Sequence, residues 1–419
     1  MTMKSTLILC LLFAGCFLPI NGLQQQKPPD KNHQGTHQAS HASQGSEERR
    51  TRKEIVRRNT EFACKMYQEM VQKNIDKNLF FSPLSASTGF SMLTLGAKDH
   101  TLSQLSESLN LKNVPMKSIY RGFQYIIHTL NQPDRDLSLH LGNTLFIEDQ
   151  LRVQKKFLND AKNIYETETI PVDFEDPQNA ITKINNYVSQ KTNGKINKMI
   201  KNLDPRMTLL MISHIYFQGE WEKKFNPKNT KEEDFFLING KSVKVPMMYR
   251  GGKYKTAYDE ELSCTILEMP FKGNVTGLFI LPDKGKLQKV EEGLHENKLT
   301  QWKQSLKCSS VDVSLPKFSI SGTYDMKKCL SGLGVTRIFD GSADLTRISP
   351  QKTLKVSQAV HKAVLKMDEK GAEAAGGTGI ETLPMTVPQI IKLNTPFVMI
   401  ITDDITQSVL FMGKIMNPK

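Results

Sequence analysis

The sequence predicts one large α+β domain, running from about residue 49 to residue 419, on three observations. Apolar side chains in the first half recur at helical spacing, with Phe62, Met66 and Met70 on one face. The second half instead holds short apolar runs such as residues 209–217, typical of strands buried on both faces. No long linker separates the halves. Helices early and strands late within one uninterrupted chain therefore favour a single α+β domain.

The individual elements follow from the same patterns. The first helix is expected to begin near Glu54, and further helices are expected near 101–110, 118–130 and 178–192. Between them, Ser82 and Pro83 offer a helix cap and a first-turn proline, so a short strand should lead into a helix there. Strands are expected at 209–217, 275–281 and 311–315, the last with one wet face, and at 397–401 and 408–412, joined by a polar turn.

The amino-terminal segment predicts the compartment. Lys4 precedes an apolar run over residues 7–13, and the segment ends at Gly22, which is typical of a secretory signal peptide over residues 1–22. Residues 23–48 are polar and nearly devoid of large apolar side chains, which predicts a flexible tail. No later stretch reaches the roughly 20 apolar residues that a membrane span needs. We therefore expect a secreted, extracellular, soluble protein with no membrane contact.

Two of the six cysteines, Cys10 and Cys16, lie in the expected signal peptide. The remaining four are far apart and show no Cys-x-x-Cys spacing: Cys64, Cys264, Cys308 and Cys329. A zinc site or a dense disulfide framework is therefore not expected. Two interpretations stay open, four buried free thiols or one disulfide between Cys308 and Cys329.

The net charge of +13 favours contact with anionic polymers. Outside the cell these are sulfated glycans such as heparin sooner than nucleic acid, and no nucleic-acid-binding motif is present. Catalytic motifs are also missing: there is no Gly-x-Ser-x-Gly elbow, no His-Glu-x-x-His and no phosphate loop, since the glycine-rich run at 376–379 lacks the following Lys-Ser/Thr. The sequence therefore predicts neither an enzyme nor a bound cofactor or metal.

Residues 369–391 form a stretch that is long for an unstructured loop inside a compact domain, which usually signals function. At a period of two, Ala372, Ala374, Gly376 and Thr378 share one face, which is small and uncharged. No proline occurs over 371–383, so every amide there could join a sheet. The segment could therefore enter a sheet as a strand, although its residues are poor strand formers and its composition also suits a disordered loop.

Several segments, in this order, resemble the signatures of the serpin family and its antitrypsin-like extracellular clade. They are Asn-Leu-Phe-Phe-Ser-Pro-Leu-Ser at 78–85, Phe-Gln-Gly-Glu-Trp at 217–221, Val-Pro-Met-Met at 245–248, Val-His-Lys-Ala at 360–363, Asn-Thr-Pro-Phe at 394–397 and Phe-Met-Gly-Lys-Ile-Met-Asn-Pro at 411–418. The resemblance extends over nearly the whole chain after about residue 55. It implies the serpin fold, with three β-sheets, a surrounding helical bundle and an exposed reactive-centre loop.

The resemblance also implies a mechanism, in which a serine protease attacks the loop and the cut loop inserts into the main sheet. Counting from the hinge places the reactive bond at Met385–Thr386. Methionine, preceded by Leu383 and Pro384, suits the apolar pockets of chymotrypsin-like or elastase-like proteases better than a trypsin-like pocket. The expected protein is thus a monomeric suicide inhibitor. A non-inhibitory serpin that acts as a carrier or binding protein is the alternative.

The resemblance assigns roles to further residues. The hinge comprises Glu369, Gly371, Ala372, Glu373, Ala374, Ala375 and Gly376. Many inhibitory members have threonine where Ala372 stands, but alanine is small and uncharged, so insertion should survive. Trp221 matches the tryptophan at the breach, the point where the loop enters the sheet, although a packed core aromatic residue would look the same in sequence.

The shutter, a hydrogen-bonded cluster beneath the opening sheet, is expected to contain Ser82, Ser85 and His361, with His214 in place of the family's asparagine. One interpretation is a tolerated replacement. The other is a pair of histidines beneath the sheet that makes its opening depend on pH.

Two features lie outside these segments. Asn274-Val275-Thr276 is an acceptor sequence for N-glycosylation at Asn274. A basic run could bind heparin or another sulfated glycan: Arg49, Arg50, Arg52, Lys53, Arg57 and Arg58. Lys298, Lys303 and Lys307 form a weaker second patch. A solvated, charged helix start would have the same composition, and both interpretations stay open.

Overall fold

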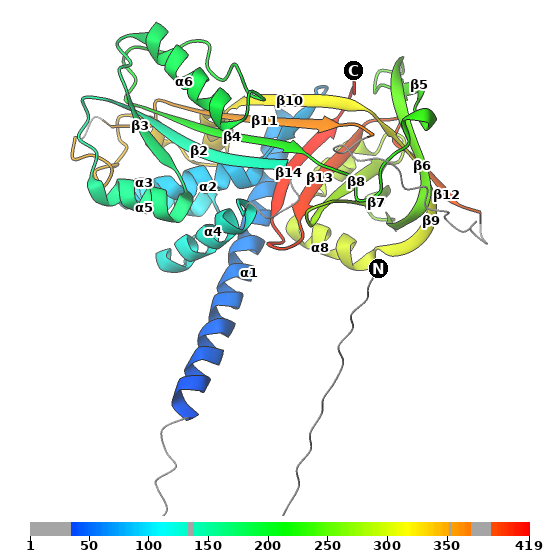
Figure 1. Ribbon diagram of the computed structural model, residues 1–419, viewed down its shortest axis with the longest axis horizontal. Helices are drawn as coiled ribbons and strands as arrows, with labels where there is room; N and C mark the ends of the chain where they lie inside the picture. The colour runs from blue at the N-terminus through cyan, green and yellow to red at the C-terminus, as the bar shows by residue number, and fades with distance from the viewer. Residues whose placement is uncertain (1–34, 133–137, 352–353, 370–386) are drawn as a thin grey trace, which may run out of the picture. The chain divides into compact units, whose positions relative to one another are not determined.

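The computed structural model describes residues 35–132, 138–351, 354–369 and 387–419 (Figure 1). Contacts between Cα atoms divide the chain into residues 1–48 and a compact unit of residues 49–419. The expected signal peptide, the hinge from Gly371 to Gly376 and the Met385–Thr386 bond lie outside the described residues. None of the described helices is both long and apolar enough to cross a membrane.

The first helix, α1 (Gly35–Gln72), begins well before Glu54, so the expected start was wrong. Residues 35–48, the described part of the expected tail, are helical. The apolar pattern marks where a helix buries a face, which among the described side chains of α1 starts at Ile55, and not where its backbone hydrogen bonds begin. The flexible tail otherwise stays a prediction.

The predicted helices over 101–110, 118–130 and 178–192 are confirmed as α3, α4 and α6. The predicted helix cap is also confirmed, because the Ser82 hydroxyl accepts a hydrogen bond from the amide of Ser85 and Pro83 occupies the first helical position. The helices after α1 are α2 (Pro83–Leu93), α3 (Asp99–Ser108), α4 (Met116–Leu130), α5 (Lys155–Tyr165), α6 (Pro177–Lys191), α7 (Leu287–Glu292), α8 (Glu296–Ser305) and α9 (Met326–Gly332), with 3-10 turns at Pro227–Asn229 and Arg337–Phe339.

The five-stranded sheet has the order β10 (Phe318–Asp325), β11 (Gln358–Met367), β4 (Leu209–Gln218), β2 (Ser138–Glu148) and β3 (Glu168–Val172). At its centre β4 and β11 run parallel, with His361 opposite Ser213 and Lys362 opposite His214. The prediction that residues 209–217 form a strand buried on both faces is confirmed.

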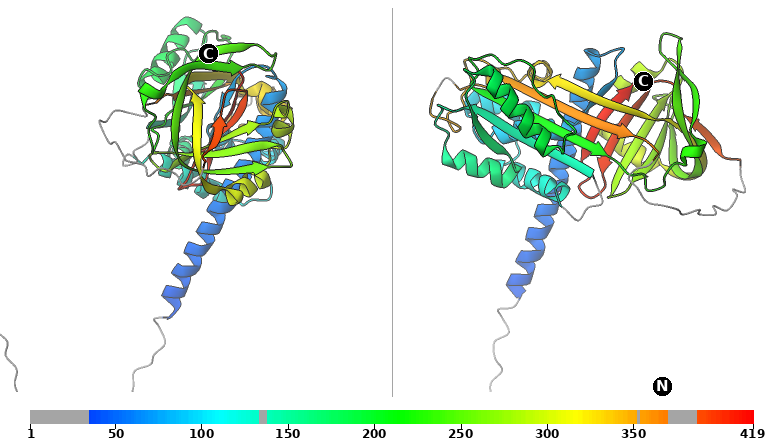
Figure 2. Two further views of the ribbon diagram at one scale, coloured as in Figure 1. Left: turned by 90° about the vertical axis from the view of Figure 1, so that its right-hand side faces the viewer. Right: turned by 45° about the horizontal axis from the view of Figure 1, so that its top comes forward.

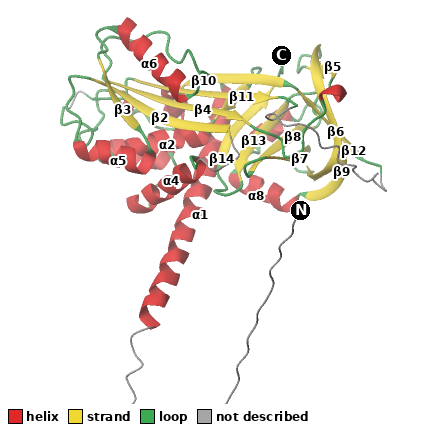
Figure 3. Ribbon diagram, in the orientation of Figure 1, coloured by secondary structure: helices red, strands yellow, loops and turns green. Residues whose placement is uncertain are grey.

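The second sheet has nine strands. Their order is β1 (Leu79–Phe81), β14 (Val409–Ile415), β13 (Phe397–Asp403), β8 (Val275–Pro282), β7 (Cys264–Phe271), β6 (Ser242–Asp259), β9 (Lys307–Pro316) and β12 (Gln389–Lys392), with β5 (Lys231–Phe236) also on β6. The long strands β6 and β9 join two of the three expected sheets into one hydrogen-bonded unit, because β6 pairs with β5 at one end and with β7 at the other. Figure 3 shows these strands beside the helix-covered sheet.

Helices cover both faces of the five-stranded sheet (Figures 1 and 2). On one face α6 packs Ile184 and Val188 against Ile212 and Val360, in a small core of its own. On the other face α2 belongs to the main core of the unit, which is continuous with the second sheet. Any opening between β4 and β11 must therefore take place between two packed layers.

The four cysteines outside the expected signal peptide are free. Cys64, Cys264 and Cys329 are buried, and burial raises the pKa of each of these thiols to about 12. Cys308 is exposed, so the interpretation as buried free thiols holds for three of the four, and the alternative Cys308–Cys329 bond is not formed.

Candidate functional site

The candidate site lies beneath the pair of strands β4 and β11, where the imidazole of His361 connects three elements. Its Nε2 accepts a hydrogen bond of 2.9 Å from the amide of Ser82, at the start of α2. Its Nδ1 lies 3.0 Å from the hydroxyl oxygen of Ser213 on β4. Because the Ser82 amide can only donate, the neutral ring carries its proton on Nδ1 and donates it to Ser213.

Two further contacts complete this network. The hydroxyl oxygens of Ser85 and Ser213 are 2.6 Å apart, and the amide of Ser85 donates to the hydroxyl of Ser82 at 3.1 Å. The ring of Tyr324 stacks on His361 with 6.4 Å between ring centroids, and its hydroxyl accepts from the amide of Phe80 at 3.0 Å. We call Ser82, Ser85, Ser213 and His361 the shutter network; all four are fully buried. Its members satisfy one another, which is the condition for a buried polar cluster to be stable.

Burial lowers the pKa of His361 to about 3, and the nearby His214 acts in the same direction. The ring is therefore neutral at physiological pH. A neutral imidazole can donate from one nitrogen and accept at the other, which is the arrangement that the shutter network uses.

The expectation that His214 belongs to the shutter is wrong, because Ser213 occupies that place. Successive side chains of a strand point to opposite faces, so Ser213 faces His361 while His214 points to the face covered by α6. There the imidazole lies over Gly142 of β2, so close that a Cβ on Gly142 would lie 2.7 Å from its Cε1 and Nε2 atoms. Ser213 is the residue that sequence reasoning missed, because β4 is buried along nearly its whole length and offers no regular hydrophobic alternation from which the face of Ser213 could have been found.

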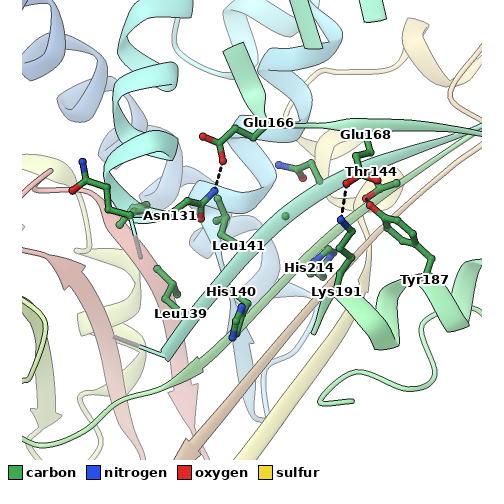
Figure 4. A pocket seen from close by; sticks show the side chains of 14 residues that line it. Asn131, Leu139, His140, Leu141, Thr144, Glu166, Glu168, Tyr187, Lys191 and His214 are labelled. Atoms are coloured by element: carbon green, nitrogen blue, oxygen red, sulfur yellow. Dashed lines mark hydrogen bonds and ion pairs between the residues drawn. The ribbon is translucent and has the colours of Figure 1, made fainter. Parts of the chain in front are cut away.

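His214 lines a polar cavity of about 440 Å³ between β2, β4 and the end of α6, together with His140, Tyr187 and Lys191 (Figure 4). Its side chain is 4 % exposed, and Nδ1 has no hydrogen-bond partner among the described residues. Burial lowers its pKa to about 4, with smaller contributions from His140 and Lys191. Lys191 is in turn paired with Glu168 at 2.6 Å.

Trp221 lies at the end of β11, and its role at the breach stays a prediction. It is fully buried and stacks on Phe271, with ring centroids 4.3 Å apart. Its Nε1 donates a 2.9 Å hydrogen bond to the carbonyl of Asp368, one residue beyond β11. The side chain is thus a packed core aromatic that also ties the end of β11 to the second sheet.

Glu369 is the one expected hinge residue within the described part of the chain. It pairs with Lys317 at 2.8 Å and accepts a 2.9 Å hydrogen bond from the hydroxyl of Thr230. Burial opposes its ionisation, but these contacts outweigh burial and hold the pKa of Glu369 below its usual range. The start of the loop is therefore held by two contacts, one with Lys317 and one with Thr230.

The basic run lies on α1 and is partly engaged. Arg57 and Arg58 pair with Glu54 at 3.3 and 2.6 Å, and the guanidinium of Arg52 lies 4.0 Å from the centroid of the Tyr125 ring on α4. Glycan binding by this run stays a prediction. Lys298 does not contribute to the second patch, because it is buried and forms ion pairs with Asp259 and Glu261.

Asn274 is exposed at the tight turn between β7 and β8, where its φ is 58°. N-glycosylation there stays a prediction.

A closed sheet with a parallel central pair, a buried Ser–His network beneath it and a long connection from β11 to β12 define a recognised class of protein. The family model for Serpin (serine protease inhibitor) matches residues 57–418, and the chain belongs to the serpin family. Serpins as a family inhibit proteases and are not themselves enzymes, and serine proteases are their partners.

The chain is similar to several known members. It is 46 % identical to Serpin A12 of Homo sapiens over 97 % of each chain, and 42 % identical to Alpha-1-antiproteinase of Rattus norvegicus over 85 % of this chain and 88 % of the relative. Human thyroxine-binding globulin superposes with a TM-score of 0.83 at 37 % identity, covering 88 % of this chain and 100 % of the other. Mouse protein-Z dependent protease inhibitor gives 0.83 at 30 %, covering 89 % and 100 %. These comparisons confirm the predicted serpin fold and the likeness to the antitrypsin-like clade.

Proposed function

We propose that this chain is a secreted serine protease inhibitor that acts by the suicide-substrate, loop-insertion mechanism. Its target is a protease of chymotrypsin-like or elastase-like specificity, which cuts the Met385–Thr386 bond. The hinge from Glu369 to Gly376 then leads the loop into the five-stranded sheet between β4 and β11.

The observation that carries this proposal is the parallel pairing of β4 with β11. A strand that follows β11 through a tight turn runs antiparallel to it, and hence antiparallel to β4 as well. Insertion would replace one parallel pair by two antiparallel pairs, which are somewhat more stable per residue. The more stable strand pairing would supply a driving force for insertion, and this stabilisation is absent while the loop is intact.

The shutter network supports the same mechanism by holding the pair closed. Ser213 and His361 are register partners, and a new strand between them would move their strands roughly 5 Å further apart. The 3.0 Å contact between them must then break. Insertion of the loop therefore has to break this hydrogen-bonded network.

The direct test is incubation of the protein with a panel of purified proteases, followed by electrophoresis in SDS. We expect an SDS-stable complex with a chymotrypsin-like or an elastase-like enzyme and none with trypsin.

Met385→Arg should transfer the complex to trypsin, because the trypsin pocket carries a carboxylate. Ala374→Glu, which places a charge on the face that must be buried, should be cut without forming a complex. Cleaved protein alone with every protease would contradict the proposal.

The second candidate is a carrier or binding protein without inhibitory activity, which the likeness to thyroxine-binding globulin favours. Thermal unfolding before and after cleavage of the loop separates the two functions. An inhibitor gains greatly in stability once the loop has entered the sheet, whereas a relaxed binder unfolds at the same temperature before and after cleavage.

A further inference from the structure

A second cavity, of about 470 Å³, lies outside the five-stranded sheet. One wall is the last turns of α1 with the residues that follow, another is α7, and Ile238 in the turn between β5 and β6 closes a third side. On α1 the lining residues Gln68, Val71 and Gln72 recur at helical spacing, as do Leu287, Gln288, Glu291 and Glu292 on α7, and Ile75 follows the end of α1. Each wall therefore presents one face of its helix, and the volume is in the range of small-molecule sites.

The body of the cavity is apolar. Ile75 and Ile238 are 66 % and 62 % exposed, and they are two of the eight large hydrophobic side chains that the described part of the chain exposes. Both lie at this cavity, where Leu287 adds partly covered apolar surface. A ligand that covered the two isoleucines would remove apolar area from water, which favours binding in proportion to the area.

Three glutamines and two glutamates make up the polar lining, and two of the glutamines use their amide nitrogens in hydrogen bonds within the protein. The amide nitrogen of Gln68 donates to the carbonyls of Glu292 and Leu294, at 3.2 and 3.1 Å. The amide nitrogen of Gln288 donates to the Glu292 carboxylate at 2.8 Å. Because both amide nitrogens are engaged within the protein, the side-chain oxygens remain to accept from a ligand. No lysine, arginine or histidine is among the described residues that line the cavity.

The two carboxylates have different roles. Glu291 is buried and pairs at 3.1 Å with Lys414, which is also buried and donates to the carbonyl of Ile75. Its charge is therefore balanced inside the protein. Glu292 is exposed, so it supplies the negative charge that a ligand meets at the cavity.

We propose that this cavity binds a small amphipathic amine. An alkyl or aryl body lies against Ile75, Ile238 and Leu287, and the ammonium head donates to Glu292 and to the glutamine oxygens. The site is separate from the shutter network and does not depend on the proposed inhibitory function.

Titration calorimetry of the full chain with decylamine, decanoate and decanol tests the proposal. We expect decylamine to saturate one site and to bind about ten-fold more tightly than decanoate. Non-specific attraction favours the opposite order, because the chain carries a net charge of +13. Equal affinity for the amine and the acid, or no saturation by the amine, would overturn the proposal.

Variants locate the site. Ile238→Ser should weaken decylamine binding about five- to ten-fold, and Ile75→Ser should do the same, because each removes apolar contact. Ile405→Ser, a matched change at another exposed isoleucine, should leave binding unchanged. Glu292→Gln should weaken the amine about three-fold and leave decanol unaffected. All four variants should keep the unfolding temperature of the parent, and unchanged binding in both Ile238→Ser and Ile75→Ser would refute the site.

Discussion

His361 and His214 lie on adjacent, paired strands, yet the two faces of one sheet hold them by different means. His361 faces the α2 side, where Ser82 and Ser213 bond its two nitrogens. His214 faces the α6 side, where the close fit over Gly142 fixes the ring and Nδ1 has no hydrogen-bond partner among the described residues. Burial lowers both pKa values, so the difference lies in hydrogen bonding and not in charge.

The comparison shows which ring can restrain the opening of the sheet. The contacts of His361 join β11 to β4 and to α2, so parting of β4 and β11 must break them. The contact of His214 is with Gly142 on β2, which pairs with β4 and lies on the same side of the opening. We therefore expect the first ring to matter most for stability and for insertion, and the second for the packing between β2 and β4.

The largest effect should follow from His361→Phe. The ring volume is nearly kept, but the amide of Ser82 and the hydroxyl of Ser213 lose their partner, at about 1–3 kcal/mol for each buried unsatisfied group. We expect unfolding in urea to show a loss of about 3 kcal/mol. The matched variant His214→Phe should cost less than about 1 kcal/mol, since it keeps an aromatic ring over Gly142. Equal losses in the two variants would remove the distinction between the faces.

Gly142→Ala should have the next largest effect. The added Cβ would lie 2.7 Å from the His214 ring, which must move, at about 1–3 kcal/mol for an overpacked site. In the background of His214→Ala the same change should cost little. A double-mutant cycle measures the difference, and additive effects of the two substitutions would show that His214 does not occupy that space.

The third effect concerns pH and accumulates gradually as the pH falls. The pKa of His214 is about 4 and that of His361 about 3 in the folded chain, below the ordinary value near 6.5 of an unfolded chain. The unfolded state therefore binds more protons, so stability is fully present above pH 6.5 and is lost as pH falls toward 4. Each ring contributes a slope of at most about 1.4 kcal/mol per pH unit in this window.

Thermal unfolding from pH 7 to pH 4.5 checks this dependence. His140, Lys191 and Glu168 line the same cavity as His214, and Lys362 is its register partner on β11, so the control must leave all four in place. His214→Phe does so and should remove about half of the histidine part of the slope. An unchanged slope in that variant would show that His214 does not titrate on unfolding.

The sequence allowed much of this molecule to be predicted where a signal is local. The Ser82-Pro83 cap, the strand at 209–217 and the helices α3, α4 and α6 are confirmed, because capping residues and apolar periodicity act within a few residues of the chain. The start of α1 was missed because residues 35–48 carry no large apolar side chains, so no apolar pattern in the sequence marks a helix there.

By itself the sequence determined the family and the order of the helices and strands. It also placed Ser82, Ser85 and His361 in one cluster. Only the tertiary structure decided that Ser213 and not His214 completes that cluster. The physical reason is the period of two along a strand: a shift of one residue reverses the face, and a strand that is buried on both faces carries no hydrophobic alternation to fix it. The cavity between α1, α7 and Ile238 likewise exists only through packing, since the wall at residues 68–75 is more than 150 residues from Ile238 and α7 in the chain.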